Sequence, residues 1–96
     1  MRKEKLQPHN NQKSFYGKAY IIRRTDGIIE LMSYDTIVGF IDRNQFHRTW
    51  NGYSVTTLNH VNSFLQEFGL SGGNKAWWNS LPIARRTYID TSLMAV

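Results

Sequence analysis

The first run of apolar residues in the chain predicts a β-hairpin. Residues 18–24 read Lys-Ala-Tyr-Ile-Ile-Arg-Arg, which is rich in the β-branched and aromatic side chains that favour a pleated strand. Asp26-Gly27 follows, and both residues of this pair tolerate the positive φ angles of a tight hairpin turn. Residues 28–34, again mostly apolar, are therefore expected to form the return strand.

Two more strands are expected after this hairpin. Residues 36–41 are apolar on both faces except at Gly39, which is typical of a strand in the middle of a sheet. The polar residues 42–44 predict a second turn, and residues 45–50 a fourth strand. The expected sheet is therefore a four-stranded antiparallel meander with short connections.

One long amphipathic helix is expected to follow the sheet. Apolar residues recur there at three- and four-residue spacing, at Leu58, Val61, Leu65 and Phe68. Ser54, Thr56 and Thr57 all offer side-chain oxygens that can cap the start of a helix, and Gly69 is placed to end it. We expect the apolar stripe to pack on one face of the meander and close the core.

The two ends of the chain differ from this body. Residues 1–14 are polar and without periodicity, which predicts a flexible basic arm, while residues 15–96 are expected to form one domain. Residues 75–81 predict a short second helix capped by Asn74, and residues 83–96 are ambiguous. The predicted fold class is therefore α+β: a ββββα unit with a short C-terminal helix and a basic N-terminal arm.

Composition limits the class of protein. A chain of 96 residues with 41% hydrophobic content is the size of one domain with a thin core. The absence of cysteine excludes disulfides and thiolate metal sites, and it fits a reducing compartment. The basic start is not followed by an apolar signal segment, and no apolar run reaches the length of a membrane span. We therefore expect a soluble, cytoplasmic protein with no membrane contact.

The positive charge is concentrated at the two ends of the sequence. The net charge is +5, of which residues 1–18 contribute +4, residues 19–69 contribute −1 and residues 70–96 contribute +2. Basic flanks on a nearly neutral body suit a polyanion, because each neutralised phosphate releases condensed counterions. The alternative is that the charge only keeps the protein soluble.

Candidate chemistry is sparse. Three of the carboxylates fall at expected turns, where aspartate is common for backbone reasons: Asp26, Asp35 and Asp42. The chain has no Gly-x-Ser-x-Gly motif, residues 72–75 lack the spacing of a phosphate-binding loop, and the histidines lack metal-ligand spacing. We therefore expect no enzymatic activity, no catalytic residue, no metal and no cofactor, and we interpret His60 as a boundary residue that makes a hydrogen bond.

The tryptophan pair is the strongest candidate anchor for a partner. Adjacent indoles on a helix point about 100° apart, so one of Trp77 and Trp78 can pack on the core while the other stays near the surface. An exposed indole near basic residues has the composition of a base-stacking platform, and the alternative is that both rings cover the core. The candidate binding residues are Arg2, Lys3, Lys5, Lys13, Lys18, Lys75, Trp77, Trp78, Arg85 and Arg86.

Two short motifs carry a resemblance to a known family. Residues 33–38 read Ser-Tyr-Asp-Thr-Ile-Val, and residues 53–60 read Tyr-Ser-Val-Thr-Thr-Leu-Asn-His. The stretch 29–69 resembles an uncharacterised family of short phage- and plasmid-borne proteins that share a Ser-Tyr-x-Thr-x-Val strand and a Tyr-Ser-x-Thr-Thr-x-x-His helix entry. The resemblance implies a mobile-element protein acting in a bacterial host cell and a small sheet-plus-helix fold, but it assigns no activity.

Three functions remain as hypotheses. The first is a phage-type protein that contacts nucleic acid or a nucleoprotein complex through its basic flanks and an exposed tryptophan. The second is an inhibitor of the anti-CRISPR kind, which blocks a host defence nuclease complex through a protein surface. The third is a homodimeric structural accessory protein.

Overall fold

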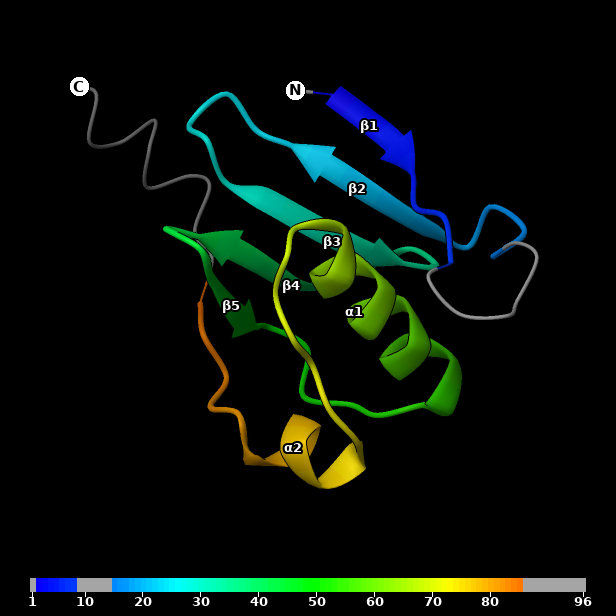
Figure 1. The fold of residues 1–96 in the computed structure, drawn as a ribbon, viewed down its shortest axis with the longest axis vertical. Coiled ribbons are helices and arrows are strands. Elements are labelled where there is room, and N and C mark those ends of the chain that lie inside the picture. Colours follow the sequence, from blue (N-terminus) through cyan, green and yellow to red (C-terminus); the bar gives the residue numbers. More distant parts are fainter. Residues whose placement is uncertain (1, 9–14, 86–96) are drawn as a thin grey trace.

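The computed structural model describes residues 2–8 and 15–85, which form a five-stranded antiparallel sheet and two helices. The strands follow one another across the sheet in chain order, α1 lies across one face, and the short α2 lies near β5 (Figure 1). The bounds are β1 Arg2–Lys5, β2 Ala19–Arg23, β3 Ile29–Ser33, β4 Thr36–Asp42, β5 Gln45–Arg48, α1 Val55–Glu67 and α2 Lys75–Ser80. The α+β class, the meander and both helices are thus confirmed.

The predicted number of strands is wrong by one, because the start of the chain joins the sheet. Arg2–Lys5 was expected in a flexible arm, but it pairs with β2 from Arg2 opposite Arg23 to Lys5 opposite Tyr20. The pairing continues into Leu6, whose N–H donates to the carbonyl of Ala19 at 3.0 Å and whose side chain is buried. Burial of this leucine fixes the start of the chain against the core.

The hairpin turns depend on residues with positive φ. Between β2 and β3 only Gly27 has positive φ, at 87°, and the loop is closed by an Arg24 N–H that donates to the Ile28 carbonyl. This geometry fits a three-residue loop rather than the tighter turn that the Asp-Gly pair predicted. Between β4 and β5, both Arg43 and Asn44 have positive φ, as in the two-residue turn that matches strand twist.

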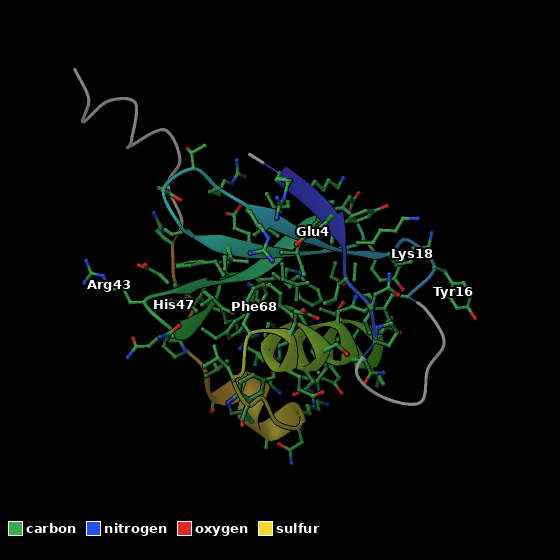
Figure 2. All side chains as sticks on the ribbon, turned by 45° about the horizontal axis from the view of Figure 1, so that its top comes forward. Glu4, Tyr16, Lys18, Arg43, His47 and Phe68 are labelled. Atoms are coloured by element: carbon green, nitrogen blue, oxygen red, sulfur yellow. The ribbon has the colours of Figure 1, made fainter. Side chains whose placement is uncertain are left out.

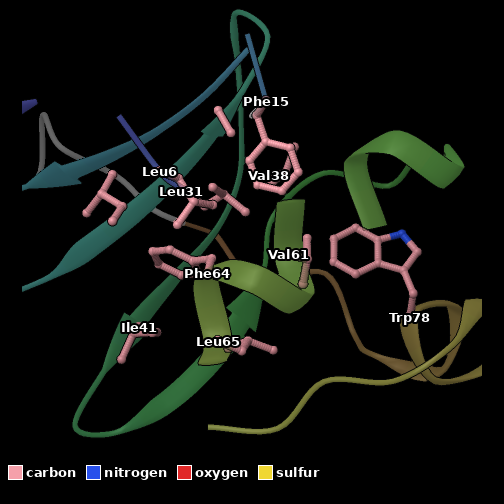
Figure 3. Packing of buried hydrophobic residues seen from close by; sticks show 11 residues of the cluster. Leu6, Phe15, Leu31, Val38, Ile41, Val61, Phe64, Leu65 and Trp78 are labelled. Atoms are coloured by element: carbon pink, nitrogen blue, oxygen red, sulfur yellow. The ribbon is translucent and has the colours of Figure 1, made fainter. Parts of the chain in front are cut away.

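Helix α1 closes the core as its apolar stripe predicted. Val61, Phe64 and Leu65 are completely buried against the sheet, where Leu31 is also fully covered (Figure 3). Ser54 caps the helix, since its Oγ accepts a hydrogen bond from the Thr57 N–H at 3.0 Å. Gly69, with a φ of 75°, follows the last turn in the left-handed conformation expected of it.

The face of the sheet turned away from α1 carries a mixed row of side chains. Strand pairing aligns one residue from each strand across this open face: Lys3, Ile22, Glu30, Phe40 and His47. The Glu30 carboxylate is fully buried and accepts a 2.6 Å hydrogen bond from Arg24 Nε. The open face therefore has a buried carboxylate between two apolar side chains at its centre and a cation at β1.

Candidate functional site

Four exposed cations gather at the β1 side of the sheet. Three of them lie on β1, an outermost strand of the described sheet, and the fourth directly precedes β2: Arg2, Lys3, Lys5 and Lys18. Antiparallel pairing places Lys5 opposite Tyr20, so the end of β1 lies beside the start of β2 and Lys18 (Figure 2). We call these four residues the β1 edge.

The negative charge near the β1 edge is already neutralised. Glu4 is the sole carboxylate of β1 and β2, and it accepts a 2.8 Å hydrogen bond from Arg23 Nε, with Arg2 at 3.7 Å. Arg23 also lies over the Phe68 ring, 5.3 Å from its centroid, so this cluster is on the α1 side of the sheet. Within the described part of the chain, no ion pair engages Lys3, Lys5 or Lys18.

An aromatic ring lies among these lysines. Tyr20 points to the open face together with Lys3 and Lys5, and the Lys3 ammonium is 4.4 Å from its ring centroid. The ring extends toward the preceding turn, because a Cβ at Gly17 would lie 3.5 Å from the Tyr20 hydroxyl oxygen. Cationic groups beside a half-buried aromatic ring are suited to contact phosphates and bases.

The other predicted cations lie near the opposite edge of the sheet. Lys75 is exposed on α2, 5.0 Å from the ring centroid of Tyr53, and Arg85 is exposed just after the chain passes β5. There, the Ala84 N–H donates to the Arg48 carbonyl at 2.7 Å. Because the strand order is β1 to β5, the structure does not bring the two basic flanks together. Lys13 and Arg86 are outside the described residues.

The expectation that Trp78 could be an exposed anchor is corrected by its burial. Only 1% of its surface is exposed, its indole N–H donates to the Gly52 carbonyl at 2.8 Å, and the Arg48 guanidinium lies 4.5 Å from its ring centroid. Trp77 is half-buried and packs near Phe46, with ring centroids 6.3 Å apart. The two indoles leave α2 in directions about 100° apart. Both meet apolar surface, because α2 lies between β5 and the loop before α1.

The two sequence motifs meet in one buried hydrogen-bond cluster. Ser33 Oγ, from the first motif, lies 2.9 Å from Thr57 Oγ1 and 2.8 Å from His60 Nδ1, both from the second. The Phe15 ring and the imidazole pack in a T-shaped arrangement with centroids 4.5 Å apart, and burial lowers the pKa of His60 to about 4. His60 forms the expected hydrogen bond but lies in the core rather than at its boundary.

This cluster joins β3 to α1 and is closed to solvent. A serine beside a histidine resembles a nucleophile and its base, but the exposed fractions of Ser33, Thr57 and His60 are 2%, 5% and 1%. In this conformation no substrate reaches them. Among residues 2–8 and 15–85, no group of three or more metal-ligating side chains gathers, and no helix is long and apolar enough to cross a bilayer.

Comparison with known proteins relates most of the described fold to one protein family. One protein-family model matches residues 4–80, from β1 to the end of α2. The chain belongs to the DUF8033 family. This family is described as one of unknown function, so the match carries no activity, and the expected phage or plasmid origin stays a prediction. No curated protein and no solved structure matches the chain.

The matched residues 4–80 contain both short motifs, although the match does not show that the family shares them. Ser33, Thr57 and His60 form the buried cluster, so their identity has a structural reason. Sequence reasoning missed Tyr20 as a neighbour of the lysines, since that contact depends on the unpredicted β1. It also missed the buried Arg48, for which an isolated arginine in a strand gives no signal.

Proposed function

We propose that this DUF8033 protein binds nucleic acid through the β1 edge. The observation that carries the proposal is the convergence of Lys3, Lys5 and Lys18, which are exposed and form no ion pair within the described residues. Their ammonium groups are available for phosphates, whereas the nearby Glu4 is already held by arginine. Side chains two residues apart on a strand are spaced by roughly 7 Å, which suits successive contacts along an extended backbone.

The proposal differs from the sequence-based hypothesis in its geometry. Charge at both ends of the chain predicted one surface made of two flanks and a tryptophan. Trp78 is buried and Arg85 lies near the other edge, so the β1 edge supports the function without them.

Removing the three lysine charges is expected to weaken binding and reduce its salt dependence. For the variant K3Q/K5Q/K18Q, the slope of log K against log salt should fall by about 2, since each single-strand phosphate contact contributes about 0.7. The measurement is fluorescence anisotropy of a labelled oligonucleotide from about 50 to about 200 mM salt. Binding should weaken most at the low-salt end, where the attraction between ammonium and phosphate is screened least.

Arg43 offers a matched control for the lysine variant. It is an exposed cation at the β4–β5 turn, across the sheet from β1, so Arg43→Gln should leave the salt slope nearly unchanged. If only total charge mattered, Arg43→Gln would lower the salt slope by about a third as much as K3Q/K5Q/K18Q, and that result would contradict a localised interface. Binding to a lysate protein that persists after nuclease digestion, with no oligonucleotide binding, would favour the inhibitor hypothesis instead.

A further inference from the structure

Two tyrosines near the β1 edge adopt a backbone conformation that is rare for aromatic residues. Tyr16 has a φ of 53° and is 74% exposed, and Tyr34 has a φ of 59° and is 48% exposed. Glycine or asparagine adopts this left-handed conformation with less strain, and for a bulky residue it is an outlier. Such strain is concentrated at functional sites, where the surrounding structure holds the residue in place.

The two tyrosines belong to turns that are hydrogen-bonded to each other. The turn of Tyr16 is closed by the Lys18 N–H, which donates to the Phe15 carbonyl at 2.9 Å. The Tyr34 N–H in turn donates to the Lys18 carbonyl at 2.6 Å. Figure 2 shows Tyr16 and Lys18 together at one end of the molecule, with the Tyr16 ring pointing outward. We call Tyr16, Lys18 and Tyr34 the tyrosine end.

The tyrosine end is continuous with the β1 edge. Lys18 belongs to both. Tyr20 also connects them, because its ring lies under the Lys3 ammonium and its hydroxyl lies beside Gly17, in the turn of Tyr16. The ring of Tyr34 lies at the α1 side of this end, where its centroid is 5.9 Å from that of the buried His60, and about half of its surface stays exposed. The one carboxylate in this turn is the exposed Asp35.

We infer that the tyrosine end stacks bases of a single-stranded nucleic acid whose phosphates lie along the β1 edge. This inference rests on the proposed function and specifies its ligand. Exposed aromatic rings next to a row of cations bind unpaired bases. In a duplex the flat faces of the bases are stacked on one another and are not accessible to such rings. The contact of the Tyr34 ring with His60 also reduces the conformational entropy that this ring loses on binding.

The test replaces both rings without disturbing the turns. Asparagine tolerates the left-handed conformation, so Y16N/Y34N should stay folded, with relief of strain offsetting the lost contact between Tyr34 and His60. Its affinity for a labelled single strand should fall at least about tenfold, while its weaker affinity for a duplex of the same sequence should not change. The matched control Y16F/Y34F keeps both rings and should bind the single strand like the natural protein.

The possible results separate this inference from the proposed function. If K3Q/K5Q/K18Q weakens binding but Y16N/Y34N does not, the stacking role is wrong and the phosphate-binding edge stands. If the unaltered protein binds neither single strand nor duplex, both ideas fail. If Y16N/Y34N instead lowers a concentration-dependent mass measured by light scattering, the tyrosine end joins two copies of the chain and the inference is overturned.

Discussion

Replacing Trp78 with alanine is expected to lower the free energy of unfolding by about 3–5 kcal/mol. Among residues 2–8 and 15–85 it is the largest fully buried side chain, and 1% of its surface is exposed. Truncation leaves a cavity next to the core and removes the surface on which the Arg48 guanidinium rests. It also leaves the Gly52 carbonyl without the indole N–H that donates to it.

Urea unfolding followed by circular dichroism measures this destabilisation as a lower midpoint at an unchanged slope. The neighbouring Trp77→Ala is the control, because the same side chain is removed from a half-buried position on the same helix. Its destabilisation should be clearly smaller, since less apolar surface leaves the core. Equal effects of the two variants would contradict the assignment of Trp78 as the residue that anchors α2.

The cation that holds Trp78 is Arg48, which lies 30 residues away in the sequence, and not one of the neighbouring basic residues that suggested a partner-binding surface. Arg48 Nη1 donates to the Trp78 carbonyl at 2.9 Å, and Arg48 Nε donates to the Trp50 carbonyl at 2.8 Å. The arginine is thus a fixed link between β5, α2 and the loop before α1. Trp78, a candidate anchor for a partner in the sequence, thus attaches a short helix to a thin core together with Arg48.

Local signals predicted the elements best. The stripe of α1, its Ser54 cap and Gly69 are separated by a few residues, and the structure confirms all three. β1 was missed because it has no apolar alternation: Arg2–Lys5 is charged at every position, and its pairing depends on β2 and on the burial of Leu6. Register with a distant strand is a tertiary property that periodicity does not report.

The sequence identified the lysines of the candidate site but not the aromatic residues beside them. Charge counting identified Lys3, Lys5 and Lys18, because charge is a property of residue type. Their meeting beside Tyr20 required the β1–β2 pairing. The tyrosine end was invisible, because turn chemistry predicts glycine or asparagine at positive φ and gives no reason to expect Tyr16 or Tyr34 there.

Acidification is expected to destabilise the fold through His60. Its folded-state pKa of about 4 is below the ordinary value of 6.5 because burial disfavours the charged imidazolium. The described side chains around it are the hydroxyls of Ser33 and Thr57 and the rings of Phe15 and Tyr34, with no carboxylate to stabilise the charge. The unfolded chain therefore binds the proton more readily than the folded chain.

The sign and range of this effect follow from the two pKa values. Above pH 6.5 the neutral form dominates in both states, and the contribution of His60 to stability is fully present. As the pH falls from 6.5 towards 4, this contribution decreases by at most about 3 kcal/mol, because a tenfold change in proton affinity corresponds to about 1.4 kcal/mol.

The variant His60→Asn separates this decrease from every other effect of acid on the chain. Asparagine keeps a polar atom near the position of Nδ1 for Ser33 but does not titrate, while the rest of the chain is the same in both proteins. The difference in unfolding free energy between natural protein and variant should therefore shrink from neutral pH to pH 4. A constant difference across this range would mean that the imidazole is not buried in its neutral form, and the cluster joining β3 to α1 would need another description.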